Sequence, residues 1–105
     1  LYSIPGHCST AIHISLHRCG VPFEVEVLAR GEPKPASFLS LNPSGTVPLL
    51  VDGDLVLTQG VAILCHADAH HPASRLFGTR TDAQQRSEAM RWLCFANTDL
   101  HGAFA

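Results

Sequence analysis

The middle of the chain carries a hairpin signal, and this signal limits the possible folds more than any other feature. Two short apolar segments, residues 47–51 and 55–57, flank the pair Asp52-Gly53. An Asp-Gly pair between apolar segments is typical of a tight turn between antiparallel strands, because glycine tolerates a positive φ. We therefore expect two adjacent antiparallel strands in this region.

Strand and helix patterns alternate before and after this hairpin. Residues 1–4 are strand-like, and residues 23–27 alternate apolar and acidic side chains, as a half-buried strand does. Apolar residues recur at helical spacing in 9–19 and in 60–70, and a short helix is expected over 36–41. The order β-α-β-α-β-β-α predicts an α/β fold.

The C-terminal third of the chain has a different character. Residues 72–81 contain proline, glycine, serine and threonine and predict a linker. Thr81 and Gln84 have the spacing of a capping box, so a helix is expected over 82–105. Its apolar side chains fall within an arc of about 120° and are Ala89, Trp92, Leu93, Ala96, Leu100, Ala103 and Phe104. Because one helix beside a small sheet cannot cover this stripe, we expect the first helix of a truncated all-α domain.

Composition disfavours several classes of protein. Hydrophobic residues make up 46% and charged residues 15% of the 105 residues, as in globular domains. The net charge is −2 and the basic residues are scattered, so no stripe for nucleic acid is present. The four cysteines are widely spaced, which argues against a disulfide framework. Apolar runs stay far below the ~20 residues that cross a bilayer, so we expect a cytoplasmic protein without membrane contact.

Cys8 lies at the turn between the first expected strand and the first expected helix. A helix N-terminus carries free N–H groups and about half a positive charge, so it stabilises a thiolate from a cysteine or from a ligand. Ser9 and Thr10 add hydroxyl donors at the same point. The alternative is a cysteine that merely occupies a turn.

Two further segments offer backbone groups to a ligand. Pro48 opens a strand, and a cis Val47-Pro48 bond would expose the N–H and C=O groups of Val47. Gln59-Gly60 precedes a helix, where N–H groups and the Gln59 amide can hold a carboxylate. The alternative for this second segment is a simple helix cap.

In combination, four segments resemble the cytosolic glutathione S-transferases, and most closely the bacterial beta class, which has a cysteine where other classes have tyrosine or serine. The segments are LYSIPGHCS (1–9), NPSGTVPLL (42–50), LTQGVAIL (57–64) and TDLH (98–101). The resemblance spans essentially the whole chain. It implies a thioredoxin-like glutathione-binding domain (1–71), a linker (72–81) and the first helix of an all-helical domain (82–105).

The resemblance also implies an activity and the residues that perform it. Glutathione would be the co-substrate, its thiolate would attack a small hydrophobic electrophile, and the protein would be a homodimer without a metal. Cys8 would face the glutathione sulfur, with Ser9 and His101 beside it as catalytic residues. Thr98 and His101 would approach the site from the helical domain.

The remaining contacts that the resemblance implies involve backbone and amide groups. Val47, ahead of a cis Pro48, would pair its backbone with the cysteinyl part of glutathione. Gln59 and Gly60 would hold the γ-glutamyl end.

The chain also departs from the pattern of the beta class. Gln59 stands where a glutamate is usual, Ser3 where an aromatic residue is frequent and Ser44 where a lysine is common. A basic residue of the loop after the second strand often meets the glycyl carboxylate, and Lys34 or Arg30 is the candidate here.

Pairs of histidines four residues apart occur in two of the expected helices, at His13 and His17 and at His66 and His70. A zinc site needs three or four converging ligands, and neither pair has an evident third one. We therefore expect surface or packing roles for these histidines and no bound metal.

Three hypotheses for the function follow from these patterns. The first is a glutathione transferase. The second is a glutathione-dependent thiol–disulfide oxidoreductase that uses Cys8 to resolve mixed disulfides. The third is a non-catalytic module that keeps the fold and binds glutathione or a partner.

Overall fold

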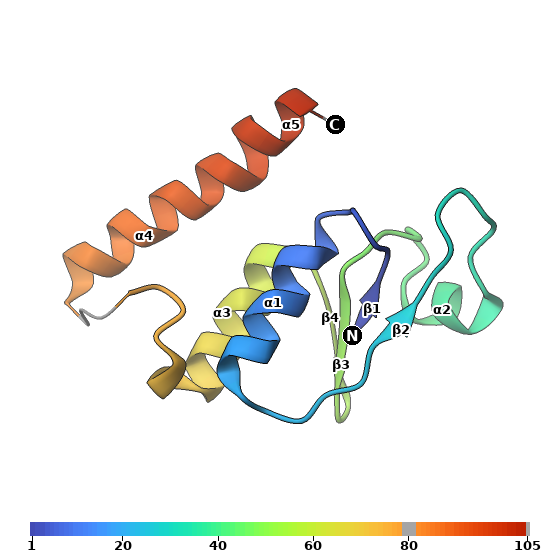
Figure 1. Cartoon of the computed structure of the whole chain (residues 1–105), viewed down its shortest axis with the longest axis horizontal. Coiled ribbons are helices and arrows are strands. Elements are labelled where there is room, and N and C mark those ends of the chain that lie inside the picture. Colours follow the sequence, from blue (N-terminus) through green and yellow to red (C-terminus); the bar gives the residue numbers. More distant parts are fainter. Residues whose placement is uncertain (79–81, 105) are drawn as a thin grey trace.

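The computed structural model describes residues 1–78 and 82–104. Its first part is a four-stranded sheet with helices on both faces (Figure 1). The elements in chain order are β1 (Tyr2–Ser3), α1 (Ser9–Cys19), β2 (Glu26–Val27), α2 (Ala36–Leu41), β3 (Leu49–Asp52), β4 (Leu55–Thr58) and α3 (Gly60–His70). This order confirms the predicted βαβαββα fold of the thioredoxin-like type.

The strands lie in the order β2-β1-β3-β4. β1 runs parallel to β2 and antiparallel to β3, and Tyr2 pairs with Glu26 on one side and with Leu49 on the other. β3 and β4 form the expected hairpin, whose last pair, Asp52 with Leu55, flanks the turn. Gly53 in that turn has a φ of 59°, which explains the Asp-Gly signal.

The second strand is shorter than the alternation of residues 23–27 predicted. Only Glu26–Val27 pairs, because β1 offers only Tyr2–Ser3 to the ladder. The alternation predicted that Val27 lies on the buried face of the strand, but its side chain is 64% exposed. Phe23 instead packs, half-buried, against the core.

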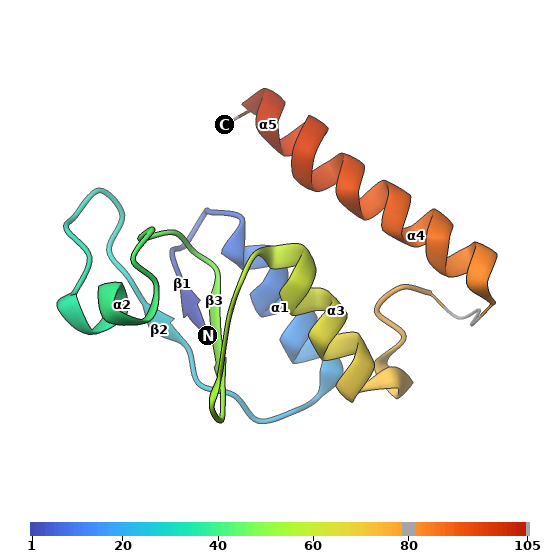
Figure 2. The same ribbon diagram turned by 180° about the vertical axis from the view of Figure 1, so that it is seen from behind.

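Two apolar clusters form the core, one on each face of the sheet. Leu49 packs with Phe38 of α2, whereas Leu50 belongs to the cluster of Ile12 from α1 and Ile63 from α3. The two leucines separate in this way because successive side chains of a strand point to opposite faces. Figures 1 and 2 show α1 and α3 together on one side of the sheet and α2 apart from them.

The buried side of α3 differs from the one that its pattern suggested. The sequence placed four residues along one side, namely Val61, Leu64, Cys65 and Asp68. In the structure Ile63 and Ala67 are buried together with Asp68, and the other three are half-buried. The reason is that α3 packs against both the sheet and α1, so helical spacing alone does not select one face.

After α3, the described elements are η1 (Pro72–Ser74), α4 (Ala83–Phe95), the π-helical turn η2 (Ala96–Leu100) and α5 (His101–Phe104). The last three form one long rod beside α1 and α3 (Figures 1 and 2). Asp82 caps α4 by accepting a hydrogen bond from the backbone N–H of Gln85 at 2.9 Å. Thr81, the other half of the expected capping box, lies outside the described residues.

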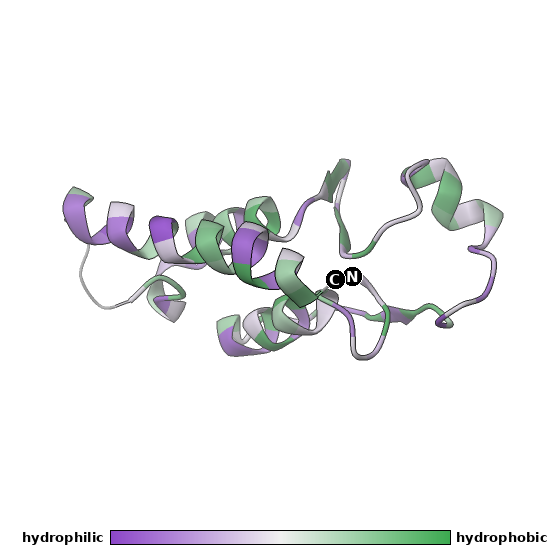
Figure 3. Cartoon of the chain, turned by 90° about the horizontal axis from the view of Figure 1, so that it is seen from above, coloured by the Kyte–Doolittle hydropathy of each residue, from purple (hydrophilic) through white to green (hydrophobic). Residues whose placement is uncertain are grey.

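Large apolar side chains remain exposed along this rod. Trp92 is 58% exposed and Phe104 is 85% exposed, and Figure 3 shows hydrophobic segments recurring along the rod. Within the described residues, these two side chains are therefore not buried in an apolar core. None of the described helices combines the length and the apolar character that crossing a membrane requires.

Candidate functional site

A cavity of about 260 Å³ lies where α1, the start of β3, the start of α3 and the C-terminal rod meet. The near wall consists of Cys8, Ala11, Ile12, Pro48, Gly60, Val61 and Leu64, and the far wall of Leu93, Ala96, Asn97 and His101. We call this cavity the Cys8 pocket. It brings together four of the residues predicted for the site from distant parts of the chain: Cys8, Pro48, Gly60 and His101.

Cys8 occupies the N-cap position of α1, with no side-chain capping bond. Its thiol is free and exposed, and it donates a hydrogen bond to the carbonyl oxygen of Val47 at 3.5 Å. The Val47-Pro48 peptide bond is cis, as the family resemblance implied. The helix N-terminus, the thiol and the backbone of Val47 therefore share one corner of the molecule.

The hydroxyl of Ser9, expected as a catalytic group, makes its hydrogen bonds inside the fold. Its side chain is fully buried, and its hydroxyl lies 2.9 Å from the hydroxyl of Ser3. The backbone N–H of Ile4 donates to the same oxygen at 3.1 Å. The hydroxyl of Ser9 therefore joins the end of β1 to the start of α1 and does not line the Cys8 pocket, and its expected catalytic role stays a prediction.

Gln59 lies at the N-cap of α3 with a φ of 72° and a ψ of 117°. A non-glycine residue in the left-handed region costs free energy, and such residues concentrate at functional sites. Gly60 follows it, and a Cβ atom at this position would lie 3.4 Å from Cδ1 of Ile12 and 3.9 Å from Cγ of Pro48. These are ordinary van der Waals distances, so Gly60 lies in contact range of α1 and Pro48 without the packing itself requiring glycine.

The far wall of the pocket differs from the expected one by a single residue. His101 lines it as predicted, but Thr98 is exposed and is not among the lining residues, whereas Asn97 is. Both Asn97 and Thr98 belong to the π-helical turn η2, which carries an extra residue compared with α-helical spacing. No sequence signal marks that turn, so Asn97 was not among the residues predicted for the site.

Lys34 and Arg30, the candidates for the glycyl carboxylate, lie in the loop between β2 and α2. Lys34 is half-buried and Arg30 is exposed. Neither lines the Cys8 pocket, so the structure does not select one over the other.

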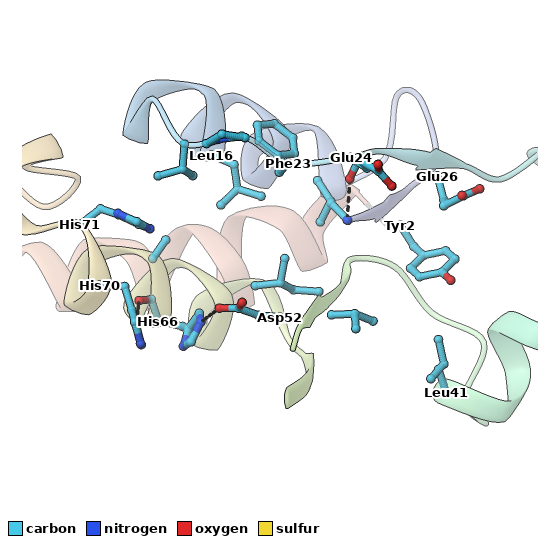
Figure 4. Close-up of a pocket in the computed structure, with 16 residues that line it drawn as sticks. Tyr2, Leu16, Phe23, Glu24, Glu26, Leu41, Asp52, His66, His70 and His71 are labelled. Carbon is cyan, nitrogen blue, oxygen red and sulfur yellow. Dashed lines mark hydrogen bonds and ion pairs between the residues drawn. The ribbon is translucent and has the colours of Figure 1, made fainter. Parts of the chain in front are cut away.

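A second, larger cavity of about 530 Å³ lies at the opposite end of the sheet (Figure 4). It contains none of the residues predicted for the site. In its wall Nε2 of His66 lies 2.9 Å from Oδ2 of Asp52, and this hydrogen bond lowers the pKa of Asp52 below its ordinary value of 3.8. Among the described residues no three His, Cys, Asp or Glu side chains gather as a metal-ligand set.

The chemistry of the Cys8 pocket suits a thiol ligand with an apolar reaction partner. Its lining is mostly aliphatic, and its polar groups are the thiol of Cys8, the Asn97 amide and the His101 imidazole. Positive charge density at the N-terminus of α1 favours an anion placed beside Cys8. The pocket thus combines a site for a thiolate with apolar walls.

Comparison with known proteins identifies the family to which the chain belongs. Residues 6–70 match the family model "Glutathione S-transferase, N-terminal domain". Glutathione S-transferase GST-4.5 of Xanthomonas campestris pv. campestris is 44% identical over 99% of this chain and 50% of its own length.

Two solved structures show the same fold. A sphingomonad glutathione S-transferase, solved in complex with glutathione, superposes with a TM-score of 0.83 and 35% identity, over 99% of this chain and 53% of its own. The beta-class glutathione S-transferase of Sphingomonas chungbukensis superposes with a TM-score of 0.82 and 32% identity, with the same coverage of 99% and 53%.

The chain thus spans about half the length of the proteins that it matches. The family model covers most of that span, from just before Cys8 to the end of α3. The resemblance seen in the sequence is confirmed: the chain belongs to the glutathione S-transferase family and is similar to its bacterial beta-class members.

Proposed function

We propose that the protein containing this chain transfers glutathione to a small hydrophobic electrophile. The observation that carries the proposal is the Cys8 pocket, in which Cys8, Pro48, Gly60 and His101 converge within the fold of a glutathione S-transferase. The glutathione complex of the sphingomonad relative supports the same ligand.

In this proposal the glutathione sulfur lies beside Cys8 at the N-terminus of α1. The partial positive charge there lowers the pKa of the bound thiol and so raises the fraction of thiolate. The thiolate attacks an electrophilic carbon, a C–S bond forms, and the leaving group departs with the electron pair of its bond. The thiol proton goes to solvent, so the transfer is balanced without an oxidant or a metal.

Other residues of the chain hold the tripeptide in this proposal. The backbone of Val47 pairs with the cysteinyl part, and Gln59 with Gly60 binds the γ-glutamyl end. His101 contributes a polar group from the far wall, and Thr98 lies on the same turn. Lys34 or Arg30 reaches the glycyl carboxylate from the loop before α2.

We further propose the organisation of the whole protein. Residues 1–71 are the glutathione-binding domain, 72–81 the linker and 82–105 the start of an all-helical domain, whose remaining helices cover Trp92 and Phe104. The protein acts as a cytoplasmic homodimer, with a detoxifying role.

Two assays on the full-length protein test the activity. Titration calorimetry measures glutathione binding, and absorbance follows the conjugation of chlorodinitrobenzene. We expect binding, and conjugation that persists in Cys8→Ala, because the nucleophile is the glutathione sulfur. Loss of hydroxyethyl-disulfide reduction in Cys8→Ala, with no conjugation in either protein, would instead establish the oxidoreductase. Absence of both reactions and of binding would leave the non-catalytic module.

A further inference from the structure

An ion pair links the glutathione-binding unit to the C-terminal rod. Oδ2 of Asp68, on α3, accepts a hydrogen bond from Nη2 of Arg86, on α4, at 3.1 Å. The side chain of Asp68 is only 10% exposed, whereas that of Arg86 is 54% exposed. Neither residue belongs to the Cys8 pocket or has a role in the proposed reaction.

The burial of Asp68 makes this contact more than a surface ion pair. Exposed pairs contribute little, but a buried carboxylate needs a partner, because the loss of its hydration is not otherwise compensated. Asp68 is itself buried, so its carboxylate has little contact with solvent. The position of the Arg86 guanidinium is therefore constrained by a group fixed in α3.

Arg86 also lies on the face of α4 that reaches the pocket. Leu93 follows it by seven residues within α4, which at about 100° per residue places Leu93 within about 20° of Arg86 around the helix axis. At about 1.5 Å per residue, Leu93 lies about 10 Å from Arg86 along the rod. Both Leu93 and Asn97 line the far wall of the Cys8 pocket. An anchor at Arg86 therefore orients the face that closes the pocket.

We propose that Arg86 is a positioning residue for the electrophile site: through Asp68 it fixes α4 so that Leu93, Asn97 and His101 stand opposite Cys8. The inference rests on the proposed transferase function and adds that the two walls of the pocket serve mainly different substrates. The near wall, built on α1, β3 and α3, binds glutathione without Arg86. The far wall, whose distance from the thiolate depends on the ion pair, selects and orients the second substrate.

The test uses the full-length protein with Arg86→Met, which keeps an unbranched side chain about as long as the aliphatic stem of arginine and removes the charged guanidinium. We expect the KM for chlorodinitrobenzene to rise by about tenfold, because small displacements of positioning groups are costly in catalysis. The Kd for glutathione should change by less than about twofold, because all of its proposed pocket contacts except that of His101 lie on the near wall. Arg86→Lys should recover most of the loss.

The matched control is Arg91→Met on the same helix. Arg91 pairs with Glu88 at 2.8 Å within α4 and lies over the ring of Trp92, so it makes no described ion pair to α3. We expect both constants to stay near those of the unmodified enzyme. If Arg86→Met folds poorly, the double variant Asp68→Asn with Arg86→Met removes the buried charge as well and should show the same raised KM.

The possible outcomes separate this inference from the proposed function. An active enzyme whose KM for the electrophile is the same in Arg86→Met, or in the double variant, overturns the inference and leaves the transferase standing. An unmodified protein that neither binds nor conjugates glutathione contradicts the proposed function. In that case, amide hydrogen exchange across residues 88–104 still tests whether Arg86 fixes α4. Faster exchange in Arg86→Met than in Arg91→Met supports the inference, and equal exchange overturns it.

Discussion

The hydroxyl oxygen of Ser9 lies 2.9 Å from that of Ser3 inside the core, at the point where the first strand gives way to the first helix. The same oxygen accepts a hydrogen bond from the backbone of Ile4 and lies 3.3 Å from the Ile4 carbonyl, to which it can donate. This network holds the turn that presents Cys8, so we expect Ser9 to act on the site through the backbone and not through contact with a substrate.

Ser9→Ala therefore tests a structural role against a catalytic one. We expect the free energy of unfolding to fall by about 1–3 kcal/mol, because buried partners of the hydroxyl lose a hydrogen bond. At a temperature where the variant is folded, kcat for conjugation should stay within about twofold of the unmodified value. Denaturant unfolding and steady-state kinetics measure the two effects. Ser15→Ala, which removes a bond from the hydroxyl to the Ala11 carbonyl on the same helix, is the control. A stable but inactive Ser9→Ala would contradict the structural role.

The backbone of Gln59 leads to a second prediction. Its φ of 72° is unfavourable for a residue with a side chain, and glycine adopts such a conformation freely. We expect Gln59→Gly to raise the free energy of unfolding by about 1 kcal/mol and to weaken glutathione binding, because the amide is lost. Thermal unfolding and calorimetry measure these opposite changes.

Gln59→Glu is the companion variant, since it keeps the length of the side chain and the constraint on the backbone. It should leave stability nearly unchanged and tighten glutathione binding, because a carboxylate attracts the γ-glutamyl ammonium more strongly than an amide does. A Gln59→Gly protein that is less stable than the unmodified one would show that the conformation at this position carries no strain.

The exposure of the cysteines gives a third prediction. Cys8 is exposed, while Cys19 and Cys65 are half-buried within the helices that pack on the sheet. Iodoacetamide should therefore alkylate Cys8 much faster than the other two, and saturating S-methylglutathione should protect it. Peptide mass spectrometry measures each rate in the full-length protein. Cys94 does not line the pocket, so its labelling should not respond to the ligand. Equal protection of all cysteines would indicate general stabilisation and not occupation of the Cys8 pocket.

The parts of the structure that local sequence determines were predictable. The Asp52-Gly53 turn needs a positive φ, and Ile12 with Leu16 on one face of α1 follows from helical spacing, so both appear in the structure as expected. The corner formed by Cys8 and Val47 was expected only from the resemblance to glutathione S-transferases, because local signals mark the turn before α1 and the Val-Pro pair separately and not their proximity.

The remaining features depend on contacts between distant segments. The burial of Ser9 follows from its packing against Ser3, and the half-buried faces of α3 follow from the presence of two neighbours. Asn97 reaches the pocket through a π-helical turn that has no pattern in the sequence. The pair of Asp68 with Arg86 bridges 18 positions, and neither residue alone indicates its partner.

Asp52 and His66 provide the last prediction, on the dependence of stability on pH. Their hydrogen bond of 2.9 Å lowers the pKa of Asp52 below 3.8 in the folded protein. A depressed carboxyl pKa stabilises the fold above the unfolded pKa, and this contribution disappears as the pH falls through the folded pKa. Asp52→Asn should therefore be less stable than the unmodified protein above about pH 4, and the two should converge at lower pH. The difference will be small and sensitive to salt, because Asp52 is exposed. Urea unfolding across a pH series measures it, with Asp54→Asn, on the other side of Gly53, as the control. A gap that stays constant down to pH 2–3 would show that the variant acts through packing or the turn and not through this ion pair.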